Sequence, residues 1–409
     1  MQKIEYYAPG DKQKVTLSML TVPVFISLVL MSSISNVNLA AIDAIGTFFL
    51  LCLLTISNLL VLFFFLKERM LPIVYANMIF FGLCFTLIGF IGLYNHANAR
   101  SFITLYQFVS VMNFTLYMSS FKWDFYKLKG ISNLSMIYIL CTVFIWAASG
   151  FPIPFSSIFS NANILAPYLL YLLFFPICMI LYKKQNIMLY LILVSGVLLC
   201  VATSARTILL SLLSIVLTYL LWHSITRSKT IFYSFFFFII MIILAVTFIY
   251  PNLSEWDHYR DLERLVWEYT GKNIFSGREV VWSHLISLIS QQPFFGYGTG
   301  TLVSDISNKT ISAHNLYLQI SLQGGYIGLS VFILLLFSIW KIFWYGQEDR
   351  IVRLSAAYLI ATLIHQLFEV SFIQNQLSIG LLQWLIIAVG ISRIYNKIEH
   401  GESFIEQKK

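Results

Sequence analysis

A histidine and an asparagine, His314 and Asn315, open a stretch in which two glycines, Gly324 and Gly325, precede an intensely apolar run. A neutral imidazole takes up a proton near neutral pH, so a histidine at an external helix start is a candidate general base. The alternative is that both residues only begin the helix, because asparagine is a good helix cap. The glycine pair breaks the helix, and we expect it to be a flexible joint that lets the short segment tilt over an external cavity.

Arg278 lies in a second promising segment, "FSGREVVWSHLISLISQQP". Ser276 and Glu279 have the S-x-x-E spacing of a capping box, which predicts a helix that ends before Pro293. A cation in the first turn opposes the helix dipole unless an anion lies nearby. Glu279 can supply that anion, but a bound phosphate supplies it better, since helix N–H groups and a guanidinium recognise the same oxygens.

Two further arginines, Arg100 and Arg206, fall in short connections on the side where the positive-inside rule disfavours them. Arg206 is the more notable, because "CVATSARTILLSLL" joins two apolar runs with almost no polar loop. A functional role as an anion-binding residue competes with an ordinary one, in which each guanidinium reaches the lipid headgroups.

Aromatic residues gather in the same part of the chain, and Trp282 and Tyr317 are candidate platforms for sugar rings. The alternative is the belt of tryptophan and tyrosine found at any membrane interface. The full set of these aromatic residues is Trp256, Tyr259, Trp267, Tyr269, Trp282, Tyr297 and Tyr317.

The run "GYGTG", 296–300, is interpreted as a turn, since it has neither the ending of a nucleotide P-loop nor a preceding buried strand.

The elements that must position these residues are membrane helices, because the composition is that of an integral membrane protein. Hydrophobic residues make up 59% of the chain and charged residues 11%, with a mean hydropathy of +0.80. Apolar runs recur along the whole chain, which predicts one all-α polytopic membrane domain over residues 1–409. About twelve spans are predicted, at 15–34, 40–66, 71–93, 101–120, 131–150, 163–182, 187–204, 206–224, 230–250, 318–345, 354–372 and 377–395.

The basic residues predict the orientation of these spans. With the amino terminus inside, nineteen of the 26 lysines and arginines fall in inner segments, so both termini are predicted to be cytoplasmic. Residues 251–313 then form one large external loop between the ninth and tenth spans, with short amphipathic helices of its own. The net charge of +8 is scattered between spans, which argues against nucleic acid as a partner.

Cysteine and acidic residues indicate no metal site. The five cysteines all fall inside apolar runs, with no other cysteine or histidine at ligand spacing. The chain also has no D-x-D pair of the kind a metal-dependent nucleotide-sugar transferase often carries. We therefore expect no metal and no cofactor.

The order of motifs resembles the superfamily of O-antigen ligases and polysaccharide repeat-unit polymerases. The motifs are "SART" at a helix end, "SGREVVW" and "PFFGYGTG" in the large loop, and "HN" followed by nine residues and Gly325-x-x-Gly328. This resemblance implies a bacterial inner-membrane glycosyltransferase of the GT-C type, acting on the periplasmic face with an undecaprenyl-diphosphate-linked oligosaccharide as donor. It also implies membrane lipid as surroundings and a flippase and a chain-length regulator as candidate partners.

Carried over motif by motif, the resemblance assigns roles to four residues. Arg206 and Arg278 hold the donor diphosphate, His314 is the general base for an acceptor hydroxyl, and Asn315 orients the histidine or the acceptor. Fixed arginines suit a diphosphate leaving group, and a sugar hydroxyl needs a positioned base.

Three functions follow from this sequence. We favour a polymerase of lipid-linked repeat units for O-antigen, capsule or exopolysaccharide, because the compact loop is more typical of polymerases. The first alternative is an O-antigen ligase, with lipid A core as acceptor. The alternative from another class is a flippase or transporter, which predicts ionisable residues within several spans. Only Asp43, His365 and Glu369 approach that description.

Overall fold

The protein is a bundle of helices. The computed structural model describes residues 24–67, 75–95, 99–182, 186–271, 273–275, 277–307 and 312–399. These ranges contain no β-strand, only an isolated bridge between Val37 and Phe159. The helices are η1 Ser33–Asn36, α2 Ala40–Lys67, α3 Ala76–Asn95, α4 Ala99–Ser119, α5 Phe125–Ala148, α6 Ala162–Leu172, α7 Phe174–Leu181, α8 Ile187–Ala202, α9 Arg206–Leu220, α10 Trp222–Ile225, α11 Lys229–Ile249, η3 Tyr250–Glu255, α12 Tyr259–Thr270, α13 Arg278–Gln291, α14 Val303–Ile306, α15 Leu316–Phe343, η4 Trp344–Gly346, α16 Arg350–His365 and α17 Leu377–Glu399.

The all-α polytopic class predicted from composition is confirmed. Seven helical segments are long and apolar enough to cross a membrane, and three shorter apolar ones accompany them: 24–36, 187–202 and 206–220. The predicted spans 101–120 and 354–372 correspond to α4 and the shorter α16, so the total of twelve crossings stays a prediction. Residues 15–23 and 71–74 of two predicted spans lie outside the described residues. The seven long segments are 40–63, 76–93, 125–148, 162–181, 229–255, 316–346 and 377–395.

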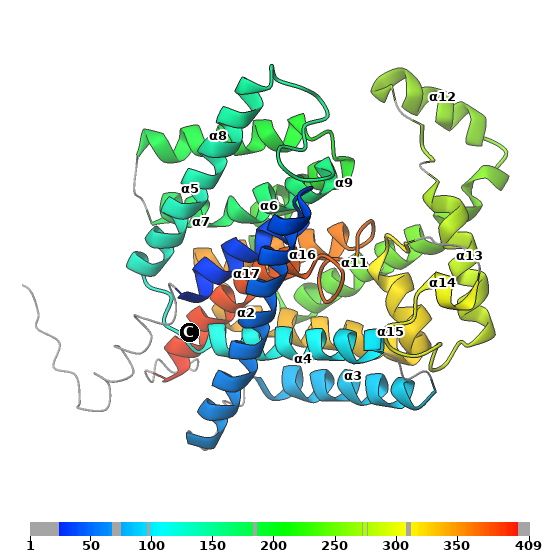
Figure 1. Ribbon diagram of the computed structural model, residues 1–409, viewed down its shortest axis with the longest axis horizontal. Coiled ribbons are helices and arrows are strands. Elements are labelled where there is room, and N and C mark those ends of the chain that lie inside the picture. The colour runs from blue at the N-terminus through cyan, green and yellow to red at the C-terminus, as the bar shows by residue number, and fades with distance from the viewer. Residues whose placement is uncertain are drawn as a thin grey trace, which may run out of the picture.

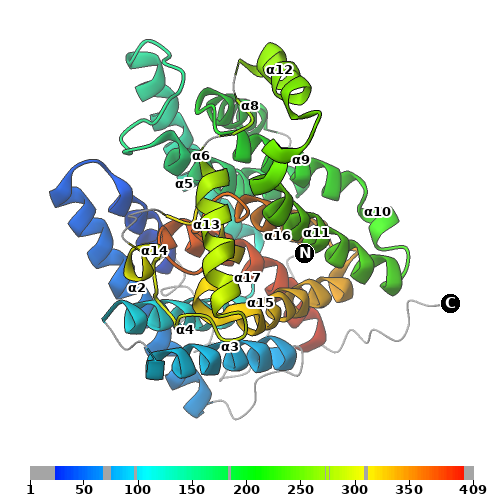
Figure 2. The same cartoon turned by 90° about the vertical axis from the view of Figure 1, so that its right-hand side faces the viewer.

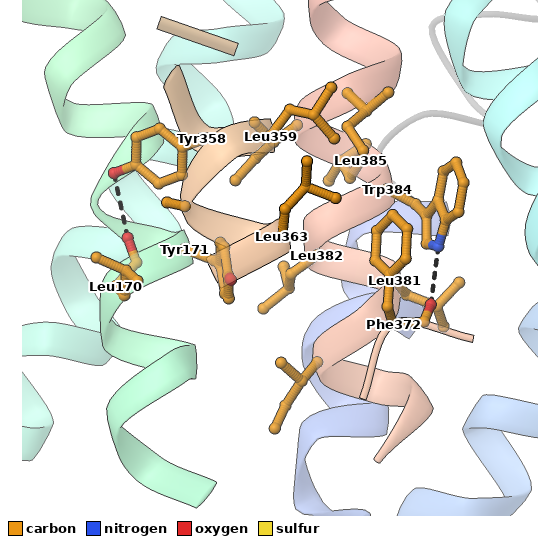
Figure 3. Packing of buried hydrophobic residues seen from close by; sticks show 14 of the residues in the cluster. Leu170, Tyr171, Tyr358, Leu359, Leu363, Phe372, Leu381, Leu382, Trp384 and Leu385 are labelled. Atoms are coloured by element: carbon orange, nitrogen blue, oxygen red, sulfur yellow. Dashed lines mark hydrogen bonds between the residues drawn. The ribbon is translucent and has the colours of Figure 1, made fainter. Parts of the chain in front are cut away.

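The centre of the bundle is formed by α17, α16 and the α6–α7 pair. Figure 3 shows the side chains that fill it, including Tyr358 of α16, whose hydroxyl donates to the Leu170 carbonyl oxygen at 3.2 Å. The Trp384 ring stacks on Phe372 with centroids 4.3 Å apart and donates its N–H to the Phe372 carbonyl. By contrast, α2, α3, α5 and α11 leave large apolar side chains uncovered, which suits helices that face lipid.

The described residues between 251 and 313 lie at one end of the bundle, which we call the loop end. Figure 1 shows α12, α13 and α14 together at this end, on the right, while α3, α4 and α15 run side by side toward it. Figure 2 views the loop end and shows α13 crossing in front of the bundle while α12 lies at its edge. Short amphipathic helices were predicted for this segment; α12 is strongly amphipathic, whereas α13 is only weakly so.

One predicted span ends early. The run predicted at 354–372 is helical only to His365, and residues 366–376 form an irregular, mostly buried turn before α17. The cause is the Gln366 side chain, whose Oε1 accepts the N–H groups of Ser371 and Phe372 at 3.0 and 3.1 Å. Irregular backbone at this depth is tolerated only where protein groups satisfy it. This turn carries Glu369 into the bundle.

The helix α15 is broken at Gly325, whose φ of 64° and ψ of −169° belong to a region that only glycine adopts readily. Residues 293–298 close the gap with four backbone hydrogen bonds. Tyr297 N and Gly298 N donate to the carbonyl oxygens of Leu322 and Gln323, at 2.8 and 3.0 Å. In return, the N–H groups of Tyr326 and Ile327 donate to the carbonyl oxygens of Pro293 and Phe294.

The expectation of a flexible joint at Gly324 and Gly325 is therefore wrong. Every residue from Leu316 to Gly325 is buried, and the break is held on both sides by the 293–298 segment. The same hydrogen bonds show that "GYGTG" is more than a turn, because it supplies the donors that the broken helix lacks. The first part of α15 is thus a fixed support for the residues that precede it.

Replacing Gly325 by alanine should destabilise the protein by about 3 kcal/mol, because the new Cβ is strained at this φ and overpacks the break. That Cβ would lie 2.5 Å from Phe295 N and nearer still to the Phe294 carbonyl group. Gly328→Ala is the matched control, since its Cβ meets only the Ile88 side chain, at 3.8 Å. Thermal unfolding in detergent should show a clear loss for the first variant and little for the second; equal melting temperatures would refute the rigid break.

Candidate functional site

Both arginines predicted to hold the donor diphosphate occupy the same structural position, the first residue of a helix. Arg206 begins α9 and Arg278 begins α13. Their N-cap residues are Ala205 and Gly277, neither of which has a side-chain oxygen to cap the helix. The cap positions therefore leave helix N–H groups available beside each guanidinium, an arrangement suited to anion binding.

The predicted capping box at the start of α13 is not formed. The N-cap is Gly277, with φ at 86°, so Glu279 occupies the second helical position and not the third. Ser276, the other member of the predicted box, lies outside the described residues. Glu279 is still an acidic residue in the first turn, and its Oε2 is buried without a hydrogen-bond partner among the described residues.

The carboxylate of Glu369 joins Arg278 to His314. Arg278 Nη2 lies 3.2 Å from Oε1, and His314 Nδ1 lies 3.4 Å from Oε2. The Glu369 side chain is only 10% exposed, whereas that of His314 is 47% exposed. The Phe368 ring lies under the guanidinium, 5.7 Å from its central carbon. A buried anion thus holds one cation and one imidazole that remain open to the loop end.

The backbone at His314 is strained, with φ at 42° in the left-handed region. Asn315 accounts for this, since it is buried and caps α15 by accepting Leu318 N–H at 3.0 Å. Its Nδ2 also donates to Thr247 Oγ1 at 3.3 Å. Asn315 therefore fixes the backbone that presents His314, which fits an orienting role better than direct contact with a ligand.

Trp282 and Tyr317 are both buried, at 0% and 1% exposure, so neither ring has a face on which a sugar can stack. The Trp282 indole N–H donates to the Ala313 carbonyl oxygen at 3.0 Å, directly before His314. The Tyr317 hydroxyl donates to the Leu363 carbonyl oxygen at 2.8 Å and so ties α15 to α16. We replace the predicted substrate-binding role of these two residues with a role in positioning His314.

Arg206 extends toward the segment that leads to Arg278, and its Nη1 donates to the Asn273 carbonyl oxygen at 3.0 Å. The packing of α9 on α16 gives the level of Arg206 in the bundle. Ser211 contacts the Ala361 carbonyl and Arg353 contacts that of Tyr219, so the two helices are antiparallel and in step. By the same register Arg206 lies level with the C-terminal end of α16, next to the turn that carries Glu369.

Arg100 is not part of this cluster in the structure. Its Nη1 pairs with Asp305 Oδ2 at 2.6 Å, and that carboxylate also accepts Leu302 N–H at 2.9 Å. Burial opposes ionisation of Asp305, but these two hydrogen bonds and the positive charge hold its pKa below the ordinary value. The pair fastens α14 to the start of α4, and the predicted substrate-binding role of Arg100 stays a prediction.

Glu369 was missed as a site residue, although the sequence contained a signal for it. An acidic residue within a predicted span is costly in lipid, which by itself marks it for function. Its partners come from segments 91 and 55 residues away in sequence, so no local spacing connects them. His365, a histidine in the same predicted span, packs edge-on against Tyr171 with ring centroids 6.2 Å apart.

The fold and site define a polytopic membrane protein whose ionic cluster lies where a large loop meets the ends of α9, α15 and α16. Residues 190–333 match the sequence model of the family described as O-antigen ligase, which confirms the resemblance to that superfamily. The match favours a glycosyltransferase-like enzyme of the O-antigen ligase or polymerase type. It contains Arg206, Arg278 and His314 and ends before Glu369. A comparison with curated proteins gave no match.

Trp282→Phe should lower glycan transfer while leaving the fold intact, because it keeps the ring but leaves the Ala313 carbonyl without its donor. An unsatisfied buried acceptor costs about 1–3 kcal/mol. The backbone at Ala313 should shift to reduce this cost, which displaces His314. Trp340→Phe is the matched control, since its N–H donates to Phe232 O at 2.9 Å from an equally buried ring nearer the opposite end of α15. Transfer rates and melting temperatures of both variants separate the roles; equal rates would contradict a positioning role.

Proposed function

We propose that this protein is a glycosyltransferase that moves a glycan from undecaprenyl diphosphate to a sugar hydroxyl of an acceptor. The observation that carries the proposal is the Glu369 carboxylate, which brings His314 and Arg278 to one place at the loop end. The half-exposed imidazole can meet an acceptor, while the helix starts at Arg206 and Arg278 offer guanidinium and N–H groups to a diphosphate.

In the proposed reaction the acceptor hydroxyl oxygen attacks the anomeric carbon of the donor glycan. The bond from that carbon to the phosphate oxygen breaks, and its electron pair leaves with the lipid diphosphate. His314 takes the hydroxyl proton, and the two arginines balance the charge that develops on the leaving group. Because these fixed cations do the balancing, the proposal includes no metal.

We further propose that the acceptor is another lipid-linked repeat unit, which makes the protein a polymerase. An O-antigen ligase is the second candidate, favoured by the family description that matches residues 190–333. The proposed setting is a bacterial inner membrane, with both termini in the cytoplasm and the loop end in the periplasm. This orientation follows the positive-inside distribution of the basic residues.

The deciding experiment incubates the purified protein in EDTA with a lipid-linked repeat unit alone, and in parallel with lipid A core added. A polymerase forms a ladder of products in the first reaction, whereas a ligase forms product only in the second. Transfer in neither reaction, with or without added magnesium, would exclude both candidates. Activity only after magnesium is added would contradict the metal-free reaction.

His314→Ala should reduce turnover by about 10²–10⁴-fold, the contribution of a positioned general base. The variant should still insert into the membrane and bind the donor. His284→Ala is a matched control on α13. The Nε2 atom of His284 contacts Ser307 Oγ at 3.2 Å, and the residue is not part of the proposed site. Product ladders from membranes that contain equal amounts of each variant measure the effect; a normal ladder from His314→Ala would exclude the base role.

Arg278→Lys should lower kcat/KM by about tenfold to hundredfold, because an ammonium cannot replace the forked donors of a guanidinium on a phosphate. Arg264→Lys on α12 is the control, since that side chain is 79% exposed and its ion pair with Asp261 spans 4.0 Å. Steady-state kinetics over a range of donor concentrations gives the ratio for each. Wild-type kinetics for Arg278→Lys would remove this residue from the diphosphate site.

A further inference from the structure

Glu369 has one carboxylate and two partners with different duties in the proposed reaction. Its Oε1 faces Arg278 at 3.2 Å, and its Oε2 faces His314 at 3.4 Å. Since the side chain is only 10% exposed, water competes little for either oxygen. The family match ends at residue 333, so it assigns no role to this residue.

We propose that the donor diphosphate displaces Glu369 from Arg278, so that donor binding leaves this carboxylate to His314 alone. Glu369 is then a positioning residue that links occupation of the donor site to readiness of the base. The inference rests on the proposed function, because it takes Arg278 as a phosphate ligand and His314 as the base.

The proposal places the proton of the neutral His314 ring on Nδ1, which faces Glu369 Oε2 at 3.4 Å. An ionised carboxylate only accepts hydrogen bonds, so Nδ1 opposite Oε2 must be the donor. The lone pair of the neutral ring then lies on Nε2, the atom left for the acceptor hydroxyl. When Nε2 takes the proton, the imidazolium that forms is paired with a charge already in contact.

The contact with Arg278 uses the group that a phosphate needs. Nη2 is taken by Oε1, and the face of the guanidinium lies over Phe368. A diphosphate carries two or more negative charges, and the helix N–H groups at Gly277 and Arg278 also favour its binding. It therefore competes strongly with Glu369 Oε1 for the same nitrogen. In the donor-free protein Glu369 therefore occupies the place of one phosphate oxygen.

Contacts other than those of this carboxylate also hold the turn. Gln366 holds the turn by accepting two backbone N–H groups, and its own carbonyl oxygen accepts Leu316 N–H at 2.9 Å. That last bond fixes the turn to the start of α15, two residues after His314. Glu369 can change partners while the backbone on both sides stays in place.

The test compares Glu369→Gln and Glu369→Asp with the wild type, using undecaprenyl diphosphate as the binding probe and the lipid-linked repeat unit as substrate. For Glu369→Gln we expect the probe to bind about threefold to tenfold tighter, since an ion pair that opposed binding is gone. Turnover should fall by about a hundredfold, because the base loses its anionic partner. Asp retains the charge with a shorter reach, so both effects should be smaller.

Glu279→Gln is the matched control, because it removes an equal charge one residue from Arg278 without a contact to His314 among the described residues. It should leave turnover near the wild-type value. The proposal is overturned if Glu369→Gln binds the probe equally or more weakly, if its turnover is unchanged, or if Glu279→Gln loses the same turnover. Failure of both Glu369 variants to fold would make Glu369 a structural residue and also overturn the proposal.

The binding measurement separates this inference from the proposed function. If the wild type transfers no glycan but Glu369→Gln still binds the probe more tightly, the exchange at Arg278 stands and the proposed reaction is wrong. If the wild type transfers glycan and Glu369→Gln gains no affinity, the reaction stands and the exchange is wrong.

Discussion

The structure depends on how the break in α15 is satisfied. A helix interrupted in the interior of a membrane protein leaves donors and acceptors that lipid cannot pair. Here residues 293–298 supply four backbone hydrogen bonds to the two sides of Gly325, so a loop that follows α13 becomes part of a membrane helix. Because α13 carries Arg278 at its start and α15 carries His314 just before its first residue, this connection sets the two functional residues relative to each other.

A second irregular segment meets the first one at the site. Residues 366–376 leave helical geometry because the Gln366 side chain takes the place of helix acceptors, and this turn brings Glu369 beneath Arg278 and His314. Removing such a carboxylate from water is expensive, and the cost is offset only when both oxygens find charged or polar partners. The shared carboxylate therefore keeps a cation and a base near each other while both remain accessible to a ligand.

Several side chains near His314 act by holding its backbone. Asn315 caps α15, Trp282 donates to the Ala313 carbonyl, and Tyr317 anchors α15 to α16. The strained φ of 42° at His314 persists because the residues on both sides are fixed in this way. A histidine held by its neighbours can remain half exposed and still point in one direction, which is what an acceptor hydroxyl requires.

The sequence by itself determined the membrane class, the helical segments, the large loop and the motif residues Arg206, Arg278 and His314. These features depend on hydrophobic runs, charge placement and local motifs, which are visible in the sequence. Only the tertiary structure decided that Glu369 joins two of them, that Trp282 and Tyr317 are buried supports, and that Arg100 pairs with Asp305 outside the cluster. It also showed a fixed break where the glycine pair had indicated a flexible joint. These facts depend on contacts between segments far apart in sequence, where burial and pairing are set by packing and leave no local pattern.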